Sequence, residues 1–445
     1  MRDATQDVVK QAANQIWDVP PPVATFAFRD GELDSIQAAY RQHEEAGSHA
    51  VVVLFGLPGV GKSQLSLAYA HRHAMDALVC WRVDASSLDS LTFDLAQLAR
   101  RMRIETVDDA EAAEAIVTEL AARTDWFLLF DNASSPDLLR AFMPQRGGRV
   151  LVTSRSPAWE AMATTIEVEP FSQEAATRFL LHRTSYPGGD GQAAEVLAEE
   201  LAGLPLALEQ VSAYCRLTGI ALADYMHRYR RERLLDKAAP GEYEMGSVTA
   251  TVILAMRLAM KQHPAAGQLL MVYAFLAPID IPRDLPLLKP TALPKILRRA
   301  TGREADFDEV VRVLLETSLV TVDQQGTLRM HQLVQQIVRT QAVVVPVRRS
   351  IFHILGFQVK PSDLKAGIAS LEWGLVVGDL LIKAQALLAE LLEDVDLNDE
   401  ELDEQQVAYK EISRTISFQA MHYHAIMADQ HEELARLHIE MAEKL

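Results

Sequence analysis

The stretch Gly56–Ser63 constrains the chain most, because its sequence, G-L-P-G-V-G-K-S, matches G-x-x-x-x-G-K-[ST] at every fixed position. It follows Ala50–Phe55, an unbroken apolar run of strand length, and precedes Gln64–Ala74, a helix-forming segment without Gly or Pro. A strand, a glycine loop and a helix direct backbone N–H groups at one anion beside the positive end of the helix. The sequence therefore predicts a phosphate cradle, and the expected binding residues are Gly56, Leu57, Pro58, Gly59, Val60, Gly61, Lys62, Ser63 and Gln64.

The loop itself and the ends of two further strands supply the residues expected to bind the phosphates and Mg²⁺. Lys62 is expected to reach the β- and γ-phosphates, and the Ser63 hydroxyl to bind Mg²⁺. Trp126–Phe130 is an apolar run that ends in Asp131, an acid expected to hold the same Mg²⁺ through water. Arg149–Thr153 runs into Arg155, whose guanidinium can contact a γ-phosphate and so report which nucleotide is bound.

Asn132 bears on the reaction that such a site can perform. Many P-loop hydrolases carry a second acid beside the first, which orients or deprotonates the attacking water. An amide can hold that water but cannot accept its proton. We therefore expect slow ATP hydrolysis at most, unless Glu160, Glu174 or another acid takes this role.

The order of apolar runs predicts the fold class, a multidomain α/β + α chain. Between residues 50 and 168 strand-like and helix-like runs alternate, which indicates a parallel sheet with helices on both faces. Helical patterns dominate after Pro170, and two short strands around Gly326 follow several helices, as in a winged helix. Residues 1–18 are expected to form a short helix that Pro20–Pro22 ends. The expected domains are an N-terminal arm and linker (1–35), a P-loop nucleotide-binding domain (36–169), a helical domain (170–240), a winged-helix domain (241–345) and an acidic helical C-terminal region (346–445).

Composition narrows the class of protein. The formal net charge of -18 opposes a mainly electrostatic nucleic-acid binder. Cys80 and Cys215 lie far apart, the first residues resemble no signal peptide, and no run reaches 18 apolar residues. The sequence therefore predicts a cytoplasmic protein without a membrane span, a disulfide framework or a zinc site. In the C-terminal region His424, His431 and His438 recur every seven residues, too far apart to share one ion, and indicate a packing stripe.

The chain carries five motifs in the order G-L-P-G-V-G-K-S, L-L-F-D-N, L-V-T-S-R, G-L-P-L-A-L and M-H-Q-L-V. By the combination and order of these motifs, the chain resembles, over about residues 18–345, signal-transduction ATPases with numerous domains (STAND) of the NB-ARC type. The resemblance implies three domains closed around one ADP, and a bacterial NLR-like signalling or defence role. Further roles that it implies are adenine packing for Pro205, β-phosphate contact for His331 and nucleotide binding for Arg29. The family has an aspartate after this histidine and a glycine before this arginine, where the chain has Gln332 and Phe28.

The expected function is an ATP/ADP-operated switch that opens, and self-associates, when ATP and Mg²⁺ replace ADP. Its triggering protein partner or effector is not readable from the sequence. The main alternative is an ATP-dependent, DNA-binding transcriptional regulator that uses the winged helix. Residues 294–303 carry Lys295, Arg298, Arg299 and Arg303 and no acid, which favours it, whereas 307–316 hold three acids and one Arg, which does not. A metabolic P-loop kinase is a second alternative, but the sequence shows no acceptor site.

Overall fold

The computed structural model of the chain describes residues 15–47, 49–184, 190–235, 243–322 and 326–341, and in the C-terminal region Val377, Leu380, Gln419, Tyr423 and Met427. Two compact units are present. The first unit contains the residues up to Ala175 together with Leu204–Leu206, and the second contains Ala176–Gly203 and the residues from Ala207 onward. The further division of the second unit into helical, winged-helix and C-terminal domains stays a prediction.

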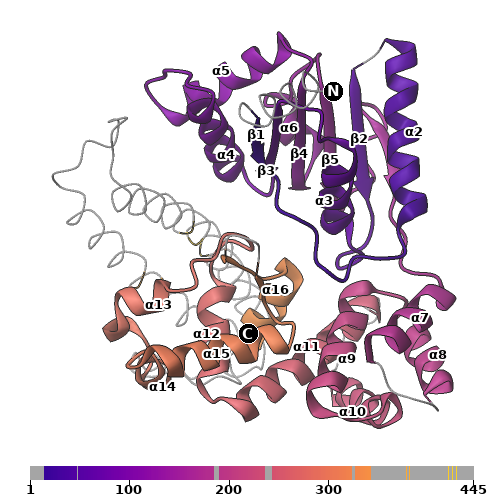
Figure 1. Cartoon of the computed structure of the whole chain (residues 1–445), viewed down its shortest axis with the longest axis vertical. Helices are drawn as coiled ribbons and strands as arrows, with labels where there is room; N and C mark the ends of the chain where they lie inside the picture. Colours follow the sequence, from indigo (N-terminus) through magenta and orange to yellow (C-terminus); the bar gives the residue numbers. More distant parts are fainter. Residues whose placement is uncertain are drawn as a thin grey trace, which may run out of the picture. The chain divides into compact units, whose positions relative to one another are not determined.

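The first unit is built on a six-stranded sheet in the order β1-β3-β4-β5-β2-β6, and every strand pair in it is parallel (Figure 1). The strand that leads into the glycine loop, β2, therefore lies next to β5 and is separated by it from β4, which carries Asp131. The strands are β1 (Ile16–Asp18), β2 (Ala50–Phe55), β3 (Val79–Asp84), β4 (Trp126–Ala133), β5 (Arg149–Ser154) and β6 (Thr164–Glu167).

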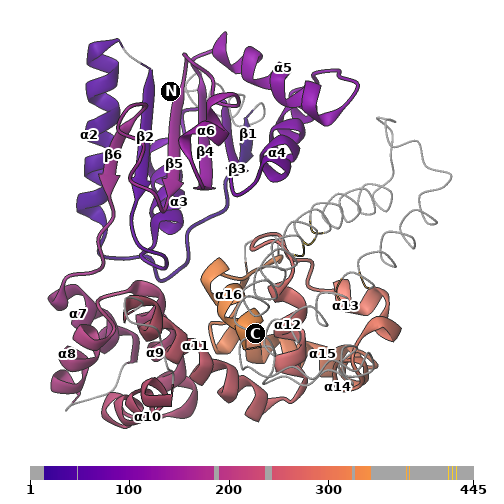
Figure 2. The same ribbon diagram turned by 180° about the vertical axis from the view of Figure 1, so that it is seen from behind.

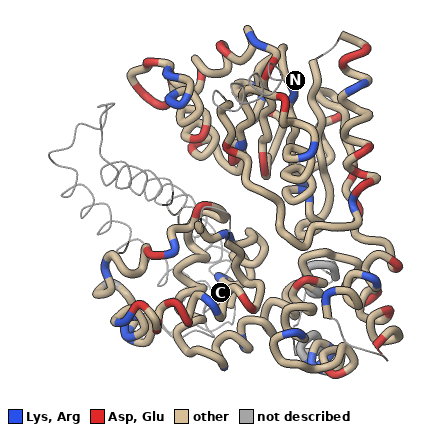
Figure 3. Tube along the Cα trace, viewed as in Figure 1, with Lys and Arg blue, Asp and Glu red and all other residues tan. Residues whose placement is uncertain are grey.

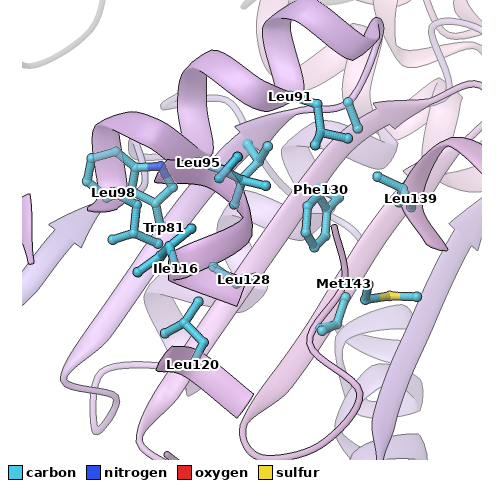
Figure 4. Close-up of a cluster of buried hydrophobic side chains, with 14 of the residues drawn as sticks. Trp81, Leu91, Leu95, Leu98, Ile116, Leu120, Leu128, Phe130, Leu139 and Met143 are labelled. Atoms are coloured by element: carbon cyan, nitrogen blue, oxygen red, sulfur yellow. The ribbon is translucent and has the colours of Figure 1, made fainter. Parts of the chain in front are cut away.

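Helices cover both faces of this sheet (Figures 1 and 2). They are α2 (Asp30–Ala46), α3 (Lys62–His73), α4 (Leu88–Arg101), α5 (Asp109–Ala121) and α6 (Pro136–Arg140). On one face α2 and α3 pack against Val52, Leu54, Leu129 and Leu151. On the other, α4 and α5 pack against alternate strand residues, and Figure 4 shows Trp81, Leu128 and Phe130 meeting Leu95 and Ile116 there. Because side chains alternate between faces, a strand buried on both must be apolar throughout, which explains the sequences of β2, β4 and β5.

The N-terminal segment differs from the prediction. Residues 16–18 form no helix; they form β1, which pairs with β3 through Ile16↔Val79 and Asp18↔Trp81. The Ile16 N–H also donates to the Leu78 carbonyl at 2.8 Å. An edge strand of three residues is defined by hydrogen bonds to its neighbour, and its own sequence carries too little periodicity to reveal it.

The second unit is helical in its described part, apart from one hairpin. Its helices are α7 (Gln173–Thr184, which begins in the first unit), α8 (Gly191–Glu200), α9 (Pro205–Thr218, whose first two residues group with the first unit), α10 (Leu222–Leu235), α11 (Tyr243–Gln262), α12 (Ala265–Ala274), α13 (Leu285–Leu288), the 3₁₀ turn η1 (Pro290–Ala292), α14 (Lys295–Ala300), α15 (Glu304–Glu316) and α16 (Gln332–Thr340). The hairpin strands are β7 (Thr321–Val322) and β8 (Leu328–Arg329), which pair antiparallel.

Helix α12 forms the centre of the second unit. All ten of its residues are buried, and α11, α14, α15 and α16 pack around it. A helix that is largely apolar on every side must be covered by other helices, because it has no polar face that could be exposed to solvent. Among the described residues no helix is long and apolar enough to cross a bilayer.

Candidate functional site

The glycine loop has the conformation that its sequence predicts. Gly56 (φ 147°) and Gly61 (φ 98°) lie in a region of backbone space that residues with a Cβ rarely enter, and a Cβ on Gly56 would meet the Val168 carbonyl oxygen at 2.5 Å. Helix α3 begins directly after the loop without a side-chain cap and with no acid in its first turn. The first turns of α4, α5 and α6, in contrast, are capped by Ser87, Asp108 and Ser135. The N–H groups at the start of α3 are therefore left for another acceptor.

Lys62 folds back over this loop. Its ammonium group donates to the carbonyl oxygens of Gly56 at 2.8 Å and Leu57 at 2.9 Å. Burial and, to a lesser extent, the positive charge of Arg155 lower the pKa of Lys62 to about 8, against the raising effect of Asp131. Arg155 and Asp131 thus both lie within electrostatic reach of Lys62. The Arg155 side chain itself is exposed.

The carboxylate of Asp131 is the centre of a polar cluster, which we call the Asp131 cluster and which comprises Ser63, Arg82, Asp131 and Thr153. One oxygen, Oδ1, accepts hydrogen bonds from the hydroxyls of Ser63 at 2.7 Å and Thr153 at 2.5 Å. The other, Oδ2, accepts from the Arg82 guanidinium at 2.6 Å. The cluster therefore joins α3, β3, β4 and β5 at the carboxyl ends of the strands, the edge where open parallel sheets bind ligands.

The charges in the cluster stabilise each other. Burial alone would raise the pKa of Asp131, but the charge of Arg82 and the three hydrogen bonds hold it below its ordinary value. Burial also acts to lower the pKa of Arg82, and the charges of Asp131 and Asp84 outweigh that effect and raise it. Both side chains are 8% exposed. Each partner therefore favours the ionised form of the other, although the pair is almost out of contact with water.

Asn132 adopts a left-handed conformation with φ 62°. The pairing of β4 with β5 is irregular between Phe130 and Ala133, and the Asn132 N–H donates to the Thr153 hydroxyl at 2.8 Å. Asparagine tolerates this conformation better than most residues. The bulge positions the Thr153 hydroxyl, which accepts this hydrogen bond and donates its own hydrogen bond to the Asp131 carboxylate.

These residues fit a nucleotide with Mg²⁺. The uncapped start of α3 and the Lys62 ammonium offer donors to phosphate oxygens. Ser63 and Asp131 place two oxygen ligands side by side, and Mg²⁺ is typically held by one or two such protein ligands with phosphate and water. Among the described residues no group of three or more His, Cys, Asp or Glu side chains forms a metal site of the all-protein kind. The histidine stripe at 424–438 lies outside the described residues.

Two other predicted residues, Arg29 and Gln64, hold the backbone of the loop and of the segment before it. The Arg29 guanidinium is 5% exposed, donates to the Val60 carbonyl at 3.0 Å, pairs with Glu32 and lies 4.5 Å from the Phe171 ring centroid. The Gln64 side-chain carbonyl accepts from the Val23 N–H at 2.8 Å. In this structure Arg29 fixes the backbone of the loop, and Gln64 fixes the segment that follows the three prolines.

Pro205 and His331 lie in different units. Leu204–Leu206 group with the first unit, and the Leu206 N–H points to the Gly59 carbonyl at 3.4 Å, so Pro205 is adjacent to the loop. His331 lies in the second unit, where it is exposed and caps α16 by accepting from the Leu333 N–H at 3.1 Å through Nδ1. Neutral His331 therefore carries its proton on Nε2. Its role toward a nucleotide stays a prediction.

Sequence reasoning missed Arg82 and gave Thr153 no role. Arg82 is flanked by apolar residues in β3, which lies between β1 and β4, and a charge at such a position must find a buried partner. Side chains of a strand alternate between its two faces, so Leu129 and Asp131 lie on the same face of β4. Arg82 pairs in register with Leu129 and therefore lies on the same face of the sheet as Asp131. Finding the partner requires this register, which the sequence of either strand alone does not give.

Comparisons with known proteins concern the fold. A family model described as a domain of unknown function (DUF7779) matches residues 258–343. No curated protein matches the chain by sequence. Among solved structures, a STAND protein with a tetratricopeptide-repeat sensor from Pyrococcus horikoshii is similar with a TM-score of 0.44 and 13% identity, over 94% of this chain and 66% of that one.

Two structures of proteins bound to DNA are similar over shorter stretches of this chain. Drosophila ORC gives a TM-score of 0.36 at 10% identity, over 74% of this chain and 91% of that one. The ORC1 protein of Aeropyrum pernix gives 0.34 at 15% identity, over 73% and 94%.

Proposed function

We propose that the first unit binds ATP and ADP with Mg²⁺ and that the exchange of one for the other operates a conformational switch of the NB-ARC type. The observation that carries this proposal is the convergence of Lys62, Ser63 and Asp131 beside the uncapped start of α3. Mg²⁺ bound by Ser63 and Asp131 would neutralise phosphate charge. Lys62, which now donates to the loop carbonyls, would turn its donors to the β- and γ-phosphates.

The switch depends on contacts that differ between the two nucleotides. Arg155, which already acts on the pKa of Lys62, would contact a γ-phosphate that only ATP carries. His331 would hold the ADP state from the second unit, and Pro205 would pack on the adenine in both states. A nucleotide shifts such an equilibrium only by its differential affinity for the two states. We propose that the ATP state is open and self-associates.

Hydrolysis in this scheme is slow and resets the switch. Asn132 offers no proton acceptor, and its backbone N–H is committed to Thr153. Glu160 and Glu174, the alternative acids, are both exposed. Nothing in this arrangement favours rapid turnover.

Calorimetric titration with ADP and ATP tests the proposal. Lys62→Ala removes the ammonium group that would donate to the β- and γ-phosphates, which is expected to weaken binding by at least about 100-fold. Lys295→Ala, on α14 of the second unit, serves as the matched control and should bind as the wild type does. Equal affinities for the wild type and Lys62→Ala would refute the site. Light scattering with each nucleotide would then test self-association, and His331→Ala should loosen ADP and shift the protein toward the larger species.

A second candidate function, DNA binding, is favoured by one observation. Residues 285–303 contain no acid, and the five basic residues among them are all exposed: Lys289, Lys295, Arg298, Arg299 and Arg303. Figure 3 colours the basic and acidic residues along the Cα trace. None of the five forms an ion pair with a residue that the structure describes, whereas Arg283 and Arg312 nearby are paired with acids. Clustered cations of this kind contact phosphate backbones.

A gel-shift titration at two salt concentrations separates the two functions. DNA binding through this stretch should weaken steeply as salt rises, and Arg298→Ala with Arg299→Ala should reduce the salt dependence. The control is Arg312→Ala, which removes an arginine already paired with Glu309 and Glu316. Absence of any shift at low salt would exclude the candidate.

A further inference from the structure

The Asp131 carboxylate is already neutralised by a residue of this chain. Arg82 donates to Oδ2 at 2.6 Å, while Ser63 and Thr153 occupy Oδ1. The two charged side chains are equally buried, and the neighbouring strands β1 and β4 enclose β3 on both sides. Arg82 thus takes a position beside Asp131 that nothing in the phosphate-binding motif requires.

The location of Arg82 makes it a fixed part of the site. It is anchored in the backbone of a central strand, next to Asp84, whose N–H is bonded to the Asp94 carboxylate at 2.7 Å. A guanidinium on such a strand is held in place, because its departure would leave the buried Asp131 carboxylate without a counter-charge. The positive charge therefore remains near Asp131 in every state in which the sheet is intact.

We propose that Arg82 is a built-in counter-ion that stands in for the divalent cation at Asp131, so that the first unit binds ADP almost equally well with and without Mg²⁺. This inference rests on the proposed nucleotide site. Arg82 contacts Asp131 rather than the nucleotide, and it is accordingly a positioning residue. A metal bound at Ser63 and Asp131 must share the carboxylate with Arg82, and the neighbouring positive charge weakens that metal's binding.

The proposal predicts a ratio, the Kd for ADP in EDTA divided by the Kd in Mg²⁺, which calorimetry measures directly. For the wild type we expect a ratio below about 3, since Arg82 already neutralises the carboxylate. Arg82→Met, which keeps the side-chain volume and removes the charge, should raise the ratio to at least about 10. Arg82→Lys restores the charge and should return the ratio toward the wild-type value.

Arg149→Met is the matched control. Arg149 begins β5, the strand beside β4, at the opposite end of the sheet from Asp131, and its guanidinium lies over the Tyr40 ring. Its ratio should equal that of the wild type. Identical ratios for wild type and Arg82→Met would overturn the proposal. If Arg82→Met does not fold, the wild-type ratio tests the proposal by itself, because a wild-type ratio of 10 or more would also overturn the proposal.

A second measurement separates this proposal from the nucleotide site itself. Electron paramagnetic resonance of Mn²⁺ added without nucleotide should show weaker binding to the wild type and Arg82→Lys than to Arg82→Met. If the wild type bound no ADP in either buffer, the proposed function would fail. The Mn²⁺ comparison would still decide the role of Arg82, since equal Mn²⁺ binding by the wild type and Arg82→Met contradicts it.

Discussion

Both units bury polar side chains, but of opposite kinds. In the first unit, charged groups and hydroxyls converge on one carboxylate, that of Asp131. In the second unit, the buried polar groups at the end of α12 are neutral amides that bond to the backbone. Gln335 donates to the carbonyls of Tyr273 at 3.2 Å and Leu276 at 2.9 Å, and Gln419 bonds to the turn that follows.

The physical reason lies in what each region must satisfy. The last carbonyls of a helix have no partner within it, and those of α12 are too deeply buried to be solvated by water. The fully buried donors here, Gln335 and Gln419, are neutral and avoid the cost of burying a charge, and the Arg339 guanidinium, which donates to the Ala274 carbonyl, is only half-buried. Charged groups at Asp131 cost more to bury, and they lie at the edge of the sheet where open parallel sheets bind ligands. The comparison favours the first region as the proposed ligand site and the second as a scaffold.

The largest effect is expected from breaking the charge balance in the first unit. Asp131→Asn keeps the shape and leaves Arg82 buried without its counter-charge, which should cost about 3–5 kcal/mol of unfolding free energy. Adding Arg82→Met should recover part of the loss. Four of the five tryptophans, Trp17, Trp81, Trp126 and Trp159, lie in the first unit, so urea unfolding followed by tryptophan fluorescence reports mainly on it. If the double variant is no more stable than Asp131→Asn, the charges are not coupled.

A smaller loss is expected in the second unit when Gln419 is removed. Its side-chain oxygen accepts from the Ala277 N–H at 2.6 Å, and its nitrogen donates to the carbonyls of Ile279 at 2.9 Å and Asp280 at 2.8 Å. Because the site is fully buried, Gln419→Ala should destabilise this unit by about 2–4 kcal/mol. Hydrogen exchange of the Ala277 amide measures it. Unchanged exchange there would show that the C-terminal region contributes nothing to the turn at 277–280.

How far the sequence predicts each region follows from the same physics. The strands Ala50–Phe55 and Arg149–Ser154 were predictable nearly to the residue, because burial on both faces demands an apolar run. The glycine loop was predictable because few residues tolerate its backbone. Neither the Arg82 pair nor the Gln419 contacts were predictable, since each joins segments whose register or docking is set by tertiary structure. The roles given to His331, Pro205 and Arg155 toward a nucleotide stay predictions.

Gln335 gives a still smaller, ligand-independent effect. It is 2% exposed, and Gln335→Leu removes the donor to two carbonyls at the end of α12, with an expected loss of about 1–3 kcal/mol. Gln336→Leu is the matched control on the exposed side of the same helix. Thermal unfolding measures both. ADP affinity should change by less than about twofold in either variant, and a large change would contradict the assignment of this region as scaffold.

The smallest effect concerns the two cysteines, one in each unit. Burial raises the pKa of Cys215 to about 12, with Asp190 adding to the shift, and burial likewise raises the pKa of Cys80 well above that of a solvent-exposed thiol. A thiol reacts as its thiolate, so both should remain unreactive toward Ellman's reagent in the folded protein at pH 8. Two thiols should react within minutes in guanidinium chloride. A difference between the units would sharpen the comparison: if Asp131→Asn exposes Cys80 and leaves Cys215 protected, the charged cluster stabilises the first unit alone, whereas simultaneous exposure of both would show that the two units unfold together.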